Sequence, residues 1–153
     1  MSTQALNILL ERAEAERDDA LAKLQELQRQ AEAAQAQAQQ LGQYRSDYQQ
    51  RWTQQFARQT TIDIVGHYQN FGQRLDQAIA QQGAVSQFAQ QRVERAREAL
   101  RDLELRVASV RKLIERRQGE LRRSAQRREQ KATDEQAARA ALSQMNPFVR
   151  LSA

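Results

Sequence analysis

The stretch LNILLERAEAERDDALAKLQELQRQAEAAQAQAQQLGQYRSDYQQRW, residues 6–52, decides the fold of this chain. At alternating intervals of three and four residues it carries fourteen seam positions, of which all but Arg17 and Arg45 are Leu, Ala, Tyr or Trp. Polar and charged side chains flank the seam, and this sustained repeat is the signature of a coiled coil. The seam positions are Leu6, Leu10, Ala13, Arg17, Ala20, Leu24, Leu27, Ala31, Ala34, Ala38, Leu41, Arg45, Tyr48 and Trp52.

A second heptad arm follows later in the chain. Its seam positions are Ala89, Val93, Ala96, Leu100, Leu103, Val107, Val110, Ile114, Arg117, Leu121, Ser124 and Arg128. Proline is absent before Pro147, and the whole chain has only five glycines, so little in either arm interrupts a helix. Ala, Gln, Glu, Arg and Leu, which lose least on entering a helix, fill the remaining positions.

Between the arms the composition changes, because Gln59, Thr60 and Thr61 interrupt the helix formers. Either threonine is suited to cap a second helix, since its hydroxyl accepts a hydrogen bond from a free backbone amide. We therefore predict an all-α fold, a long antiparallel two-helix coiled-coil hairpin. A parallel dimer of one continuous helix is the alternative, and it leaves the threonines unexplained. The expected division is one domain over 1–146, with arms at 3–57 and 64–143, a turn near 57–63, and a flexible tail at 147–153.

Little in the sequence suggests chemistry. There is no cysteine, no glycine-rich phosphate loop and a single histidine, His67, so we expect no enzyme activity, metal or cofactor. The acidic pairs Asp18–Asp19 and Asp134–Glu135 occupy neighbouring helical positions, which point to different faces. No signal peptide is evident, and no run of about 18 apolar residues is present, so we expect a cytoplasmic protein without a transmembrane segment.

Charge differs between the arms. Residues 1–56 contain six basic and eight acidic residues, whereas residues 88–131 contain fourteen basic and seven acidic residues. This difference favours pairing between the arms. The arginines of the second arm also raise the alternative of a basic coiled coil that binds nucleic acid. They are interleaved with Glu115, Glu120 and Glu129 and accompanied by no aromatic set, so a solvated helix that can face an acidic protein is the favoured interpretation.

The segment between the arms offers a specific contact surface. Phe71, Leu75, Ala78 and Gln82 recur at intervals of four, three and four residues and share one helical face. Tyr68 and Ile79 border another face. One of these faces can pack in the hairpin and the other would then be free for a partner, although burial of the whole set is an equal alternative.

Several of these stretches are similar to the FliJ family of flagellar export proteins. The similarity rests on LNILLERAE at residues 6–14, the Tyr44-Arg45-Ser46-Asp47-Tyr48 motif before Trp52, and YQNF at residues 68–71 with Leu75, Ala78 and Ile79. A weaker match is QKATDEQA at residues 130–137. The Tyr-x-x-x-Tyr motif together with the YQNF segment is much more specific than the heptads, which any coiled coil would share.

This resemblance implies a non-enzymatic stalk of the flagellar export apparatus, with its paired ends in the pore of the export ATPase hexamer. The ends would supply an ATPase-binding set of Leu6, Leu9, Leu10, Ala13, Lys131, Asp134, Glu135 and Arg139. The middle segment would bind the cytoplasmic domain of the export-gate membrane protein through Phe71, Leu75 and Ala78, with Gln82 where the family has histidine. Export chaperones are further candidate partners, and a location at the cytoplasmic face of the inner membrane is implied. The stalk of a virulence-type secretion system is the near alternative.

Overall fold

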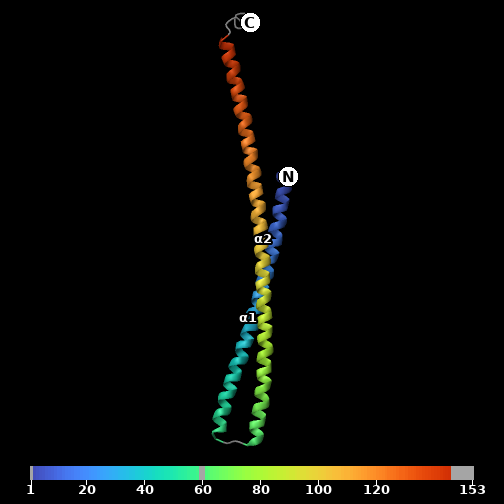
Figure 1. Ribbon diagram of the computed structural model, residues 1–153, viewed down its shortest axis with the longest axis vertical. Helices are drawn as coiled ribbons and strands as arrows, with labels where there is room; N and C mark the ends of the chain where they lie inside the picture. The colour runs from blue at the N-terminus through green and yellow to red at the C-terminus, as the bar shows by residue number, and fades with distance from the viewer. Residues whose placement is uncertain (1, 59–60, 146–153) are drawn as a thin grey trace. The chain divides into compact units, whose positions relative to one another are not determined.

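The computed structural model describes residues 2–58 and 61–145, which form two α-helices and no strand. Helix α1 spans Thr3–Phe56, and helix α2 spans Ile62–Met145 (Figure 1). The two helices contact each other and run in opposite directions, so the predicted all-α two-helix hairpin is confirmed. The alternative of one continuous helix is wrong, because α1 ends at Phe56 and α2, which begins at Ile62, runs in the opposite direction.

Polar side chains cap both helices. The amide of Ala5 donates to the Ser2 hydroxyl at 3.2 Å, which satisfies a backbone group that has no partner within α1. Thr61 plays the same part for α2, because its hydroxyl accepts from the Ile64 amide at 3.4 Å. Of the two predicted caps, Thr61 is therefore the one observed, whereas Thr60 lies outside the described residues. The predicted tail at 147–153 also lies outside them.

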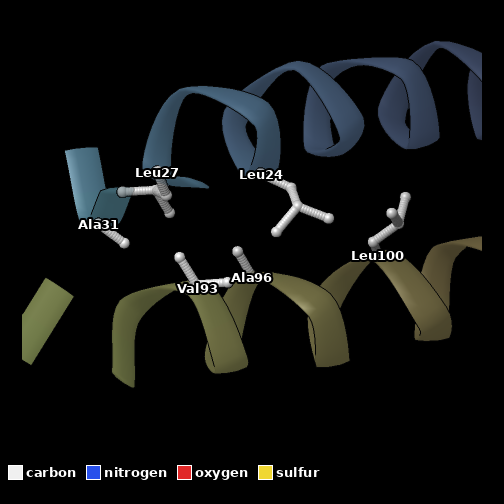
Figure 2. Packing of buried hydrophobic residues seen from close by; sticks show 6 residues of the cluster. All are labelled: Leu24, Leu27, Ala31, Val93, Ala96 and Leu100. Atoms are coloured by element: carbon white, nitrogen blue, oxygen red, sulfur yellow. The ribbon is translucent and has the colours of Figure 1, made fainter. Parts of the chain in front are cut away.

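By its internal packing the chain divides into two units, and the larger one comprises residues 14–105. Its core is a single layer of aliphatic side chains between the two helices, and Figure 2 shows these side chains pointing toward one another from α1 and α2. The centre of this layer is Val93, which is only 1% exposed. The core residues are Leu24, Leu27, Ala31, Val93, Ala96 and Leu100. Burying a Leu or Val side chain of this kind contributes about 1.5–3 kcal/mol.

The other unit comprises residues 1–13 and 106–153. Leu6 and Ala13 of α1 are buried, and so are Val107 and Val110 of α2. Leu6 also lies beside Leu113, and the two line a shallow groove with nearby charged residues of α2. Farther along α2, every residue from 125 to 145 is exposed. The apolar contacts of this unit are therefore concentrated near the first turns of α1.

The heptad pattern of α2 begins earlier than the sequence analysis indicated. Counting back from Ala89 at intervals of three and four residues meets positions that are all buried or half-buried. These positions are Val65, Tyr68, Gly72, Leu75, Ile79, Gln82 and Ser86. Glycine, glutamine and serine disguised the repeat, because a search for apolar residues passes over them. The segment between the arms is thus a continuation of the second arm, and it starts at Ile62.

Candidate protein-binding surfaces

Five aromatic side chains gather in the part of the 14–105 unit nearest the turn. Tyr48 is at their centre: its ring stacks on Tyr68 at a centroid distance of 5.5 Å and meets Phe71 at 4.7 Å. The ring centroid of Trp52 lies 6.0 Å from that of Tyr68. Phe56 contacts the same Tyr68 ring edge-on, with a centroid distance of 5.2 Å. Such ring pairs add about 0.5–1.5 kcal/mol each beyond the area that they bury. This aromatic cluster therefore joins the helix ends on either side of the turn.

Arg45 enters the same interface from α1, at a seam position that the sequence marked as an exception. Its Nε donates to Asp76 Oδ1 at 3.0 Å, and its guanidinium carbon lies 6.0 Å from the centre of the Tyr68 ring. The hydrogen bond to Asp76 raises the pKa of Arg45 above its usual value. Gly72 makes room for the guanidinium, because a Cβ at that position would lie 3.2 Å from Arg45 Nη2.

The four residues matched to the export-gate contact do not form a free surface. Leu75 is buried at 7% exposure, and Ala78 is half-buried. Gln82 Nε2 donates across the interface to the Ala34 carbonyl at 3.1 Å and to Gln37 Oε1 at 3.2 Å. Only Phe71, at 36% exposure, presents much of its side chain to solvent. The structure turns this face toward α1, because Leu75 and Gln82 occupy the seam of the extended heptad while Phe71 lies at its edge.

The predicted ATPase-binding set is also divided by the structure. Leu6 and Ala13 are buried and Leu10 is half-buried, whereas Leu9 is exposed. The charged members all lie in the exposed part of α2, and they are Lys131, Asp134, Glu135 and Arg139. The first turns of α1, expected at the same end of the hairpin as these charges, have Leu6 beside α2 residues 113–120. Lys131 is eleven residues beyond Glu120, or about 16 Å along a helix.

The arginine-rich part of α2 is exposed and partly paired within the helix. Arg117 lies 3.6 Å from Glu120, one turn later, and Arg97 lies 3.7 Å from Glu94. Pairs of this spacing stabilise a helix by a few tenths of a kcal/mol. Among the described residues no group of three or more His, Cys, Asp or Glu side chains is placed to hold a metal ion.

The family comparison decides the identity of the chain. Residues 1–146 match the model of the flagellar FliJ protein family. The chain belongs to the FliJ family. FliJ proteins are a non-catalytic flagellar family, and this member is accordingly a flagellar protein related to export. No curated protein and no solved structure matches the chain. Neither helix, over the residues that the structure describes, contains a stretch long and apolar enough to cross a bilayer.

Proposed function

We propose that this FliJ-family chain is the non-enzymatic stalk that couples the flagellar export ATPase to the export gate. In this role one part of the chain inserts into the ATPase hexamer and another binds the cytoplasmic domain of the gate membrane protein. The protein acts in the cytoplasm, at the inner face of the inner membrane, and export chaperones are further partners. Family membership and the two-helix hairpin support this proposal.

One observation carries the ATPase contact: residues 125–145 of α2 are helical and exposed at every position. A helix that is exposed on every side over about six turns can present all of its faces to the inner wall of a ring. Lys131, Asp134, Glu135 and Arg139 provide charges of both signs there. Asp134 already accepts a hydrogen bond from Gln130 at 3.2 Å, which leaves its second oxygen for a partner. We assign the ATPase contact mainly to this exposed stretch, with Leu9 as its exposed member on α1.

The test is a joint substitution of Lys131, Asp134, Glu135 and Arg139 by alanine. We expect it to abolish stimulation of the purified ATPase, because it removes the charged contacts without touching a buried residue. The matched control replaces another exposed set of two basic and two acidic residues, namely Arg97, Glu98, Arg101 and Asp102. Stimulation should survive in the control. Full stimulation by the first variant would contradict the assignment. Deleting residues 1–12 is a less clean test, because it also removes Leu6, a buried residue of the unit that contains Val107 and Val110.

For the export gate we propose that Phe71 makes the contact, while Leu75, Ala78 and Gln82 hold the helix surface in place beneath it. Truncating an aromatic anchor in a desolvated contact commonly costs more than about 1 kcal/mol of binding. Phe71→Ala should therefore weaken binding to the gate's cytoplasmic domain with a small change in Tm. Leu75→Ala should mainly lower Tm. If Phe71→Ala lowers Tm and the folded fraction binds the gate normally, Phe71 is a packing residue and the proposal fails.

Gln82 allows a finer test, since the resembled family has histidine at this position. Gln82→His should leave gate affinity equal or higher. This comparison requires that the variant, which loses the hydrogen bonds from Gln82 to α1, keeps the Tm of the unaltered protein. Weaker binding at unchanged Tm would show that Gln82 does not correspond to the family's gate-binding histidine. Asn70→His, on the exposed side of the same helix, is the control for adding an imidazole.

A further inference from the structure

A shallow groove runs between α1 and α2 within the 14–105 unit, separate from the aromatic cluster and from the exposed end of α2. Its volume is about 340 Å³, and three alanines and one leucine form its floor. The floor residues are Ala20, Leu27, Ala96 and Ala99, and the rim residues are Lys23, Arg92 and Arg95. The groove exists because the core here is one layer thick and alanine fills little of the space beside it. No acidic residue lines it.

The three rim cations are not neutralised within the part of the chain that the structure describes. Lys23, Arg92 and Arg95 form no ion pair there, although acidic residues lie close by in the sequence. Two acidic residues near the rim in the sequence are paired with other arginines: Glu26 pairs with Arg29, and Glu94 lies 3.7 Å from Arg97. A concentration of one charge sign around an apolar floor favours a ligand of the opposite sign with an apolar face.

The apolar surface continues along α2 beyond the groove. Val85 and Phe88 precede Arg92, Arg95 and Ala99 at intervals of three and four residues, so all five lie on one stripe of the helix. Phe88 is 58% exposed and Val85 is 53% exposed, although both are large apolar residues. The stripe is therefore apolar at one end, cationic in its middle and lined by alanine beyond. This order suits a third helix lying along the groove, with alternating apolar and acidic side chains.

We propose that this groove, with the Val85–Phe88 extension, is a docking site for an acidic amphipathic helix of a partner protein. The apolar face of that helix packs on the alanine floor and on Phe88, and its Glu or Asp side chains pair with Lys23, Arg92 and Arg95. Alanine at Ala20, Ala96 and Ala99 permits the close approach that such three-helix packing requires. The site is independent of the ATPase and export-gate contacts proposed above. A nucleic acid is disfavoured, because it would leave the apolar floor and Phe88 without a partner.

The test uses the full chain and two synthetic helical peptides of equal length. Both peptides carry leucine at the same heptad positions, and the flanking positions are glutamate in one and lysine in the other. We expect the acidic peptide to bind at least tenfold more tightly, measured by fluorescence anisotropy at physiological salt. The triple variant K23Q/R92Q/R95Q should lose at least tenfold in affinity for it. Ala99→Gln, which fills the groove without changing charge, should also weaken binding.

The matched control is R122Q/R123Q/R127Q, which removes the same amount of charge from an exposed part of α2. Its affinity for the acidic peptide should change less than twofold, and circular dichroism should show equal helicity in all variants. Equal losses in the two triple variants would mean that only net charge matters and would overturn the proposal. Equal binding of the lysine peptide would also overturn it. So would sedimentation showing that the groove is closed by a second copy of this chain, with self-association lost in K23Q/R92Q/R95Q.

Discussion

Two stretches of α2 carry the same heptad spacing, but their seam residues differ in burial. From Ala89 to Ile114 every seam residue is buried or half-buried, with Val93 and Val107 almost fully enclosed. From Arg117 onward the same spacing reaches Leu121 and Arg128, which are exposed, and Ser124, which is half-buried. The difference lies in whether residues of α1 cover the helix. A heptad repeat therefore indicates a capacity to pair, and a partner helix must be present for its residues to be buried.

The largest expected effect comes from placing a charge in the covered stretch. Val93→Asp puts a carboxylate where the side chain is 1% exposed, with no cation in the core layer to pair with it. Burying an unpaired charge costs several kcal/mol, so we expect loss of most of the cooperative thermal transition seen by circular dichroism. Leu105→Asp, on the same helix at 64% exposure, is the control and should melt close to the unaltered protein. Similar Tm values for the two variants would contradict the burial described for α2.

A smaller effect is expected from truncating leucines at corresponding seam positions. Leu100→Ala removes a core side chain and should cost about 2–3 kcal/mol, the low end of the usual range, because the core is a single layer. Leu121→Ala should change the free energy of unfolding by less than about 0.5 kcal/mol, as for other exposed sites. Urea unfolding of both variants measures the difference. If Leu121→Ala is as costly as Leu100→Ala, the second stretch is covered in solution.

The smallest expected effect concerns the uncovered helix itself. Gly119→Ala adds a methyl group whose nearest neighbour is Arg123 Nη1 at 3.8 Å, an ordinary contact. Alanine favours the helix over glycine by about 0.5–1 kcal/mol, so this change should slow amide hydrogen exchange in residues 120–145. Exchange near Val93 should stay unchanged, because packing rather than propensity protects it. Faster exchange after Gly119 would show that the glycine serves a packing role.

Much of the fold could be predicted from the sequence, because it follows from periodicity and from the lack of helix breakers. All fourteen predicted seam positions of α1 are buried or half-buried, Arg17 and Arg45 included. The register between the helices was harder to predict, because seams rich in Ala and Gln can pair in several alignments that differ by whole heptads. The heptads therefore did not show that Leu6 lies beside Leu113.

The candidate surfaces were harder to predict for a related reason. Phe71, Leu75 and Gln82 share a face in any helix, and only the position of α1 decides that Leu75 and Gln82 point inward. The groove between Lys23 and Arg92 left no sequence signal of its own, because it is made by alanines from both helices. A search for heptads that tolerate glycine, glutamine and serine would have found the inward face of the middle segment.

The fit of Arg45 against Gly72 has a consequence for how the two helices find their alignment. Seams made largely of alanine can slide by one heptad at little energetic cost, so something must mark the correct setting. A slip of seven residues would bring Arg45 opposite Val65 or Ile79, whose branched side chains occupy the space that Gly72 leaves empty. It would also separate the guanidinium from Asp76, now 3.0 Å away. Arg45 and Gly72 thus favour the observed alignment of the two helices over a slip of one heptad.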